Sequence, residues 1–330
     1  LFRSATHLLL DYSMEDPGGN FNQTQIDWLR RELPAFGSEA SNSDEPSLQL
    51  TQYLTFYHLP KASNDVQLIA GKSADRQTLI VAWKPTISKG TAVVVHGYMD
   101  HIGLYNHLIE YLLQQQLTVV CFDLIGHGLS SGDPGSINNF SQYVDQLEQV
   151  IALSNKHFPG PTHGIGQSMG GAILLKHLIN QTDNQQYPFT SLNLFAPLLQ
   201  PWAWKQSRRM YFLSRLFIKS IKRVFRPSSH DRDFLHFLRT RDPLQPRSVP
   251  LKWIGAMNHW VSEFERAPAN DFAINIIQGD NDKTLDWVHN LRAFRQKFTA
   301  LSVTMIATGN HHLINEKEVL RTAIFDALKI

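Results

Sequence analysis

Gly166-Gln167-Ser168-Met169-Gly170 is the stretch around which the rest of the chain is organised. An extended run at 162–165 precedes it and a helix-like run at 170–178 follows, which predicts a strand, a tight turn and a helix. Such a turn holds its serine in a strained conformation and brings strand and helix together, so only small neighbours fit. The small neighbours here are Gly166, Gly170, Gly171 and Ala172. We predict that Ser168 is a nucleophile, with an ordinary serine in a flexible turn as the alternative.

Strand-like and helix-like segments alternate on both sides of this turn. The predicted strands are 91–95, 118–122, 162–165, 191–195, 273–277 and 302–306, and the predicted helices are 104–115, 140–157, 170–180, 285–298 and 316–328. This spacing predicts an α/β fold with a mostly parallel, doubly wound sheet. Three runs at 49–58, 66–70 and 78–83 are rich in β-forming residues and predict antiparallel strands before it.

The alternation stops at Pro197 and resumes at Ala273, which indicates an insertion. We predict an N-terminal extension and linker at 1–48, with a helix at 23–33 and a polar loop at 34–47. The α/β core is predicted at 49–199 and 271–330, and a basic helical cap at 200–270. Insertions after this strand overhang the carboxyl edge of the sheet, where function collects.

The composition is that of a water-soluble globular protein, with 42% hydrophobic and 18% charged residues among 330. No apolar run reaches the roughly 18 residues that span a bilayer. Cys121, the only cysteine, lies in an apolar run and predicts a buried thiol. The first residue is Leu1, so an export signal or the true start would lie outside this sequence. We expect a cytoplasmic setting, with peripheral contact at a membrane surface.

Acidic residues and histidines follow the predicted strands at the carboxyl edge. His96 follows the first parallel strand and Asp123 the second, and two later loops carry two candidates each. These later candidates are Asp280, Asp282, His311 and His312. A serine, an acid and a histidine therefore occur in the order Ser, Asp, His.

The sequence resembles the α/β-hydrolase superfamily, and within it the monoacylglycerol lipase and bacterial lysophospholipase group. The resemblance runs from about residue 50 to the C-terminus, except in the insertion. It rests on these segments: His96-Gly97 with Tyr105, Asp123-x-x-Gly126-His127-Gly128-x-Ser130-x-Gly132, Val144-Asp145-Gln146-Leu147, Gly166-x-Ser168-Met169-Gly170-Gly171, Ala196-Pro197, Gly279-x-x-Asp282 and Gly309-x-x-His312. One departure is Gln167, which stands where histidine is common before the serine.

The resemblance implies a catalytic triad of Ser168, Asp282 and His312. The spacing Gly309-x-x-His selects His312 over its neighbour His311, and Asp282 is favoured over Asp280. The backbone N–H groups of Tyr98 and Met169 are the natural donors to the oxyanion.

These residues predict a serine ester hydrolase that cleaves single-chain lipids, lysophospholipid or monoacylglycerol, through an acyl-enzyme. A peptidase of the proline-iminopeptidase type, a thioesterase and a non-catalytic binding protein remain as alternatives. Glycine next to His96 and to His127 indicates tight loops rather than a base or metal ligands. We expect no metal and no cofactor.

The insertion concentrates positive charge. Residues 201–252 hold 13 Lys and Arg against 3 Asp, a net charge of +10, which leaves 18 basic and 26 acidic residues elsewhere. Helical spacing over 208–226 predicts a basic amphipathic helix with Arg208, Arg215, Lys219, Lys222 and Arg226 on one face. Such a face is either a solvated surface or a contact with an anionic lipid surface. No recognised motif accompanies the charge, so we expect no nucleic acid partner.

Overall fold

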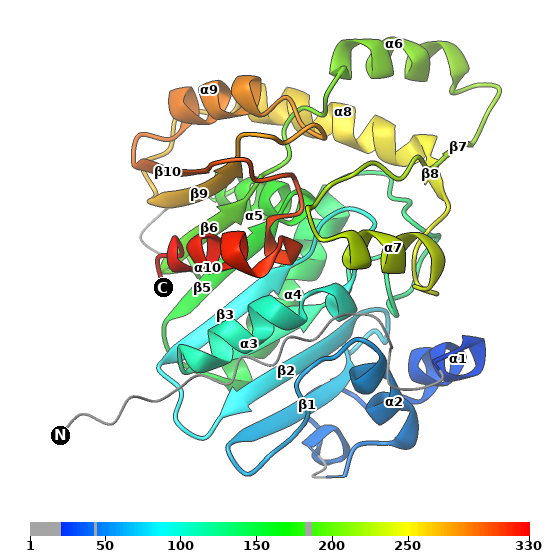
Figure 1. The fold of residues 1–330 in the computed structure, drawn as a ribbon, viewed down its shortest axis with the longest axis vertical. Helices are drawn as coiled ribbons and strands as arrows, with labels where there is room; N and C mark the ends of the chain where they lie inside the picture. The colour runs from blue at the N-terminus through cyan, green and yellow to red at the C-terminus, as the bar shows by residue number, and fades with distance from the viewer. Residues whose placement is uncertain (1–20, 43–44, 182–186) are drawn as a thin grey trace.

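The computed structural model describes residues 21–42, 45–181 and 187–330. A sheet of eight strands forms its centre, in the order β1-β2-β4-β3-β5-β6-β9-β10 (Figure 1). The strands are β1 Val66–Lys72, β2 Leu79–Pro85, β3 Gly90–Val95, β4 Leu117–Phe122, β5 Thr162–Gln167, β6 Ser191–Phe195, β9 Ile274–Gly279 and β10 Leu301–Ile306. β2 is antiparallel to both of its neighbours, and every pairing from β4 to β10 is parallel. The predicted mostly parallel, doubly wound sheet is confirmed.

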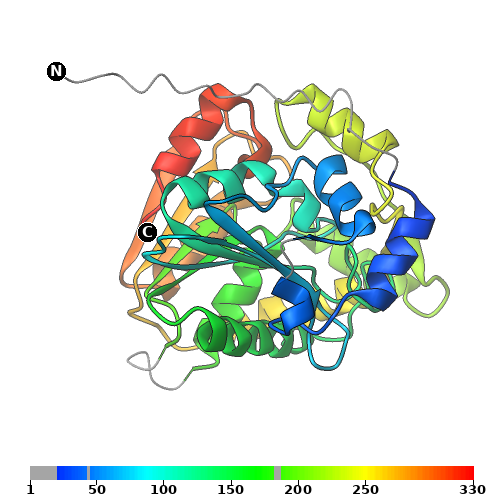
Figure 2. The same cartoon turned by 90° about the horizontal axis from the view of Figure 1, so that it is seen from below.

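Helices cover both faces of the sheet. Successive side chains of a strand point to opposite sides, so one strand can contribute to two hydrophobic cores. On β3, Val93 and Val95 belong to one hydrophobic core, and Ala92 and Val94 to the other. Helices on the two sides are visible in Figure 2. The first core takes side chains from α4 Ser141–His157, α5 Met169–Ile179 and α9 Trp287–Lys297, and the second from α3 Asn106–Gln114 and α10 Glu318–Asp326.

The described part of the N-terminal region packs onto the second core. The predicted helix is confirmed as α1 Gln23–Glu32, which begins with Asn22 and Gln25 in a capping box. Ile26 and Leu29 are buried and belong to the second core. Between α1 and the next helix, the described residues form loop and one 3-10 turn at Glu39–Asn42. Residues 1–20 of the predicted extension lie outside the described residues.

The strand predicted at 49–58 is wrong, because this segment forms α2 Leu48–Phe56. The threonine and aromatic residues of the run favour a strand locally. However, the Ser47 side chain accepts a hydrogen bond from the N–H of Leu50 and begins a helix. The buried residues Leu50, Tyr53 and Leu54 are spaced three and four apart, so burial of one helical face overrides the local preference.

The chain between β6 and β9 leaves the sheet and forms α6 Trp204–Ser214, β7 Ser220–Lys222, α7 Arg232–Thr240, β8 Ser248–Pro250 and α8 Leu251–Arg266. We call residues 200–270 the insertion. α8 is fastened to the core, where Trp260 Nε1 donates to the carbonyl of Leu198 at 3.2 Å and Lys176 pairs with Glu263 at 2.6 Å. α6 lies at the outer end of the insertion, away from the sheet (Figure 1).

The single helix predicted over 208–226 is also wrong. α6 begins earlier and ends at Ser214, and the chain then turns and pairs as β7 with β8. The register joins Ile221 to Val249, and Arg223 N–H donates to the carbonyl of Arg247 at 3.0 Å. A short β ladder at Ser220–Lys222 therefore lies where the second half of the helix is expected, in a stretch that also holds the β-branched residues Ile218, Ile221 and Val224.

Candidate active site

Ser168 lies at the carboxyl end of β5, on the turn that leads into α5. Its backbone has φ 53° and ψ −109°, in the region that non-glycine residues rarely adopt. The turn depends on glycine: a Cβ at Gly170 would lie 1.9 Å from the carbonyl oxygen of Val95, and one at Gly166 would lie 2.6 Å from the backbone of Gly170. The predicted strained turn with close flanking elements is confirmed.

His311 joins Ser168 to Asp282. Its Nε2 lies 2.9 Å from Ser168 Oγ and its Nδ1 lies 2.8 Å from Asp282 Oδ2. The Nδ1–H therefore donates to the carboxylate, and the unprotonated Nε2 accepts from the serine hydroxyl. This is the arrangement in which a histidine can take the proton of an attacking serine.

The prediction of His312 for this position is wrong. His312 Nε2 lies 3.1 Å from Asp100 Oδ2 instead, and its ring packs against Phe234 at 4.9 Å between centroids. Adjacent residues of an irregular loop point in different directions, and the motif spacing does not say which of two histidines faces the serine. The path of the loop decides this, with Thr308 at φ 60° and a 3-10 turn that begins at Leu313.

Gln167, the departure from the family pattern, helps to fix this path. Its Nε2 donates to the backbone carbonyl of His311 at 3.0 Å, although Gln167 precedes the serine on a different strand. The residue before Ser168 thus holds the histidine that is hydrogen-bonded to Ser168. Gln167 departs from the family pattern in the sequence, but nothing in the sequence indicates its partner.

Asp282 is held as an ionised acceptor. Its Oδ1 accepts from the N–H groups of Thr284 at 2.7 Å and Leu285 at 3.1 Å. Burial raises the pKa of Asp282, but His311 and these hydrogen bonds overcome burial, so the net shift is downward. Burial lowers the pKa of His311, and the carboxylate overcomes it, so that pKa is raised. Asp280 binds the N–H of Thr308 instead, as expected from the choice of Asp282.

Met169, one of the two predicted oxyanion donors, directly follows Ser168, and Tyr98, the other, lines the same cavity as Ser168. Met169 begins α5, where the first N–H groups of a helix have no partner within it. Both residues contact the insertion through Trp253 of α8. The Tyr98 ring stacks on Trp253 at 3.7 Å between centroids, and Trp253 Nε1 lies 3.4 Å from the sulfur of Met169.

A second polar network holds the loop that carries Tyr98. Tyr105 donates its hydroxyl to Asp100 Oδ2 at 3.1 Å and accepts from the N–H of Gly97 at 2.9 Å. Asp100 also receives the hydrogen bond from His312. Burial raises the pKa of Asp100, and His312 more than offsets it, so the carboxyl is held ionised. His312 is therefore connected to the loop of Tyr98 rather than to the serine.

His96 and His127 serve the loops, as predicted. His96 Nε2 accepts from the N–H of Leu124 at 2.9 Å, and its Nδ1–H donates to the carbonyl of Gly97 at 2.7 Å. Burial lowers the pKa of His96 to about 3 and that of His127 to about 4. Both rings are therefore neutral near pH 7, and neither contacts Ser168 among the hydrogen bonds of the described residues.

A cavity of about 570 Å³ opens over Ser168, within the usual range of small-molecule sites. Its floor comes from the sheet edge and its walls come largely from the insertion. The apolar wall residues are Leu198, Val224, Phe225, Leu235, Leu238, Val249, Trp253 and Leu285. Ser168 and the histidine hydrogen-bonded to it thus lie in a largely apolar pocket.

The outer end of the insertion exposes apolar and basic side chains together. Leu216 is 81% and Phe217 84% exposed, and the apolar residues of the predicted helical face are exposed rather than packed on the core. The apolar members are Trp202, Met210, Phe212, Leu213, Leu216, Phe217, Ile218, Ile221 and Val224, and the basic members are Arg208, Arg209, Arg215, Lys219, Lys222 and Arg226. We call these residues the outer patch. Among the described residues, no helix is long and apolar enough to cross a membrane.

The family model described as "Serine aminopeptidase, S33" matches residues 86–318. The chain belongs to this hydrolase family. The matched span starts before β3 and ends at the first residue of α10, so it includes Ser168, Asp282 and His311 as well as the insertion.

Individual relatives match over shorter stretches. A human monoglyceride lipase is 33% identical over 130 residues, 38% of this chain and 42% of the relative. A monkeypox virus monoglyceride lipase homolog is 34% identical over 119 residues, 36% of this chain and 42% of the relative. The Bacillus subtilis phospholipase YtpA is 29% identical over 117 residues, which cover 36% of this chain and 44% of the relative. The aligned stretches thus span less than half the length of these relatives.

Solved structures show the same fold over most of the chain. A monoglyceride lipase variant from Saccharomyces cerevisiae has a TM-score of 0.67 at 15% identity, covering 81% of this chain and 96% of that one. A Paleococcus ferrophilus monoacylglycerol lipase has a TM-score of 0.62 at 19% identity, and the match covers 76% of this chain and 97% of that one. The predicted α/β-hydrolase fold is confirmed.

Proposed function

We propose that this protein is a serine ester hydrolase that cleaves the acyl ester of single-chain lipids, lysophospholipid or monoacylglycerol. The observation that carries this proposal is His311, hydrogen-bonded to Ser168 and Asp282 at the base of a largely apolar cavity. The monoglyceride lipases and the phospholipase among the relatives support the lipid ester as substrate.

In the first half of the reaction, Ser168 Oγ attacks the ester carbonyl while His311 Nε2 takes the hydroxyl proton. Asp282 stabilises the imidazolium and keeps the ring oriented. The negative charge that forms on the carbonyl oxygen is stabilised by the N–H groups of Tyr98 and Met169. His311 then donates the proton to the leaving alcohol, and the acyl group remains on Ser168.

In the second half, water attacks the acyl-enzyme and His311 accepts its proton. The same two N–H groups stabilise the second oxyanion. Collapse of the intermediate returns the proton to Ser168 and releases the fatty acid. The largely apolar wall of the cavity suits an acyl chain, since burying each methylene contributes about 0.8 kcal/mol.

The family description raises aminopeptidase activity as a second candidate. A peptidase of this kind needs a carboxylate to bind the free amino terminus of its substrate. Among the described residues that line the cavity, the only carboxylate is Asp100, which His312 and Tyr105 already engage. This charge pattern favours an ester of a lipid over an amino-terminal peptide.

A substrate panel tests the proposal. The panel includes monoacylglycerols and lysophospholipids of several chain lengths, an aminoacyl amide and an acyl thioester, with fluorophosphonate labelling to count active sites. We expect the highest kcat/KM with a lipid ester. Faster cleavage of the amide or the thioester would refute the assignment.

We propose further that residues 200–270 act as a cap whose outer patch contacts an anionic membrane surface, and that the protein works in the cytoplasm with peripheral attachment. Exposed apolar side chains can insert into the membrane interface, and each basic residue near an anionic surface contributes about 1 kcal/mol to the binding free energy. Arg208, Arg215, Lys219, Lys222 and Arg226 are all exposed there. The exposed apolar residues favour this interpretation over a solvated charged face.

Co-sedimentation with vesicles tests the contact. We expect binding to anionic but not zwitterionic vesicles, lost at high salt and lost in the triple variant Arg215→Glu, Lys219→Glu, Lys222→Glu. A matched control reverses three exposed lysines near the opposite edge of the sheet, Lys61→Glu, Lys84→Glu and Lys89→Glu. Equal loss in both triple variants, or no loss in either, would contradict a contact through the outer patch.

A further inference from the structure

Arg223 brings a positive charge to the wall of the cavity without a direct ion pair to a carboxylate in the described part of the chain. It follows β7 directly, is half-buried, and lines the same cavity as Ser168. A partly buried cation usually has a counter-charge, so this guanidinium has capacity for an anion.

One end of the guanidinium is fixed. Its Nη1 donates to Gln245 Oε1 and to the carbonyl of Pro246, and its Cζ lies 4.4 Å from the ring centroid of Phe225. A guanidinium has five N–H donors, and Nε and Nη2 donate to no group in the described part of the chain. The Nε and Nη2 edge of this guanidinium, whose Nη1 is already hydrogen-bonded, is suited to bidentate binding of an anion.

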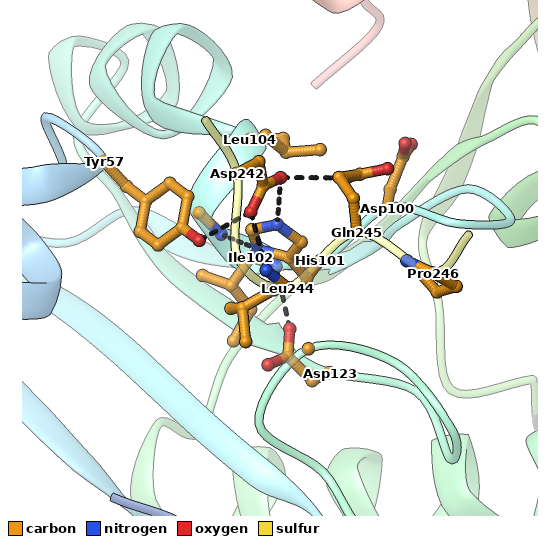
Figure 3. Close-up of polar contacts among 12 residues, drawn as sticks. Tyr57, Asp100, His101, Ile102, Leu104, Asp123, Asp242, Leu244, Gln245 and Pro246 are labelled. Atoms are coloured by element: carbon orange, nitrogen blue, oxygen red, sulfur yellow. Dashed lines mark hydrogen bonds and ion pairs between the residues drawn. The ribbon is translucent and has the colours of Figure 1, made fainter. Parts of the chain in front are cut away.

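The support behind Gln245 is buried and ordered. Gln245 Nε2 donates to Asp242 at 2.9 Å, and Asp242 also accepts from His101 at 2.9 Å and from the hydroxyl of Tyr57 at 2.8 Å. Figure 3 shows Tyr57, His101 and Gln245 converging on Asp242. His101 lies in the loop after β3 and Asp242 lies after α7, so this cluster ties the insertion to the core. Arg223 is therefore hydrogen-bonded, through Gln245, to a buried polar network.

The charged residues that line the cavity are mostly basic. Arg226 and Arg239 line the same cavity, and the carboxylate of Asp100 is engaged by His312 and Tyr105. Burial lowers the pKa of Arg223, and the neighbouring Asp100 opposes this shift. Arg223 in turn helps His312 to lower the pKa of Asp100, and it opposes the burial that raises the pKa of Tyr98, so its charge reaches the loop that carries Tyr98.

We propose that Arg223 binds the phosphate of a single-chain phospholipid whose acyl ester lies at Ser168. This inference rests on the proposed function and selects phosphate-bearing lysophospholipid over neutral monoacylglycerol. In a single-chain lipid the anion next to the glycerol is a phosphate, and a free guanidinium edge matches two of its oxygens. Arg223 is thus a specificity-determining residue, whereas the bond cleaved is the same carboxylic ester.

The test compares two octanoyl esters, octanoyl lysophosphatidic acid and monooctanoylglycerol, below their aggregation concentrations so that membrane contact does not contribute. We expect the wild-type kcat/KM to be higher for octanoyl lysophosphatidic acid than for monooctanoylglycerol. Arg223→Gln should lower that value by about 10- to 100-fold, the effect of losing one or two charge-assisted hydrogen bonds. It should leave monooctanoylglycerol within about threefold, and Arg223→Lys should restore part of the preference.

Arg247→Gln is the matched control, since Arg247 faces the same Phe225 ring at 5.5 Å but is exposed and does not line the cavity. It should leave the preference unchanged. Glycerol 3-phosphate and inorganic phosphate are tested as inhibitors of a soluble ester. Inhibition by glycerol 3-phosphate that weakens in Arg223→Gln supports a head-group site, and stronger inhibition by inorganic phosphate indicates a free-phosphate site and overturns the proposal.

An equal loss on both octanoyl esters in Arg223→Gln would show a structural role and overturn the inference. So would an unchanged preference in a folded variant. These results differ from failure of the proposed function, in which the wild-type protein cleaves neither octanoyl ester while another member of the substrate panel is cleaved.

Discussion

The two adjacent histidines give the sharpest test of the site. His311→Ala removes the group that accepts the proton of Ser168, whereas His312→Ala removes one hydrogen bond to Asp100 at 3.1 Å. Losing the base of a serine triad lowers kcat by on the order of 10⁴- to 10⁶-fold. At 1.36 kcal/mol per tenfold, this corresponds to about 5–8 kcal/mol of transition-state stabilisation.

The His312 variant should be far milder. A hydrogen bond to a charged group contributes about 1.5–3 kcal/mol, so the loss should be at most about 10- to 100-fold. Asp100 keeps its bond from Tyr105 at 3.1 Å, which limits the movement of the loop that carries Tyr98. The two substitutions, one residue apart, should therefore differ by at least about 100-fold.

The assay is kcat/KM for a short soluble ester, with fluorophosphonate labelling and thermal unfolding of each variant. Labelling should be lost in His311→Ala and slowed in His312→Ala, because a serine reacts with the probe only when activated. His312→Gln retains a donor and should recover part of the His312→Ala loss. If the order were reversed, with His312→Ala the more damaging in a folded protein, the geometry described for the triad would be incorrect.

Three further outcomes follow from the same contacts. Ser168→Ala should lower turnover by about 10³-fold or more and abolish labelling at an unchanged melting temperature; labelling of the variant at one site would identify another nucleophile. Activity should fall as pH decreases through the pKa of His311, because the base must be neutral. Since Asp282 raises the pKa of His311, Asp282→Asn should move the acid limb of the kcat/KM profile to lower pH. An acid limb that stays in place would argue against the pairing of Asp282 with His311. Gly170→Ala should destabilise the fold by several kcal/mol in chemical unfolding, because its Cβ would lie 1.9 Å from the carbonyl oxygen of Val95, and a change below about 1 kcal/mol would contradict the close packing of the turn.

The sequence by itself determined the parallel sheet and the strained turn at Ser168, because both are encoded in short, local patterns. Gly166 and Gly170 leave no room for a Cβ where β5 meets α5, and short apolar runs predict β6, β9 and β10 of the sheet after this turn. Asp282 was identified by its motif, and the backbone N–H groups of Thr284 and Leu285 bind it within the same loop. Features of this kind depend on residues only a few positions apart.

Only the tertiary structure decided which histidine faces the serine, because that depends on the path of a loop held by Gln167, which is 144 residues away from His311 in the chain. The same is true of α2, which adopts a helix because one of its faces is buried, and of the segment after α6, where pairing with β8 replaces the expected helix. Arg223 gave no signal in the sequence beyond its charge. Its position in the cavity wall results from contacts with Gln245 and Phe225 that form only when the insertion folds onto the core.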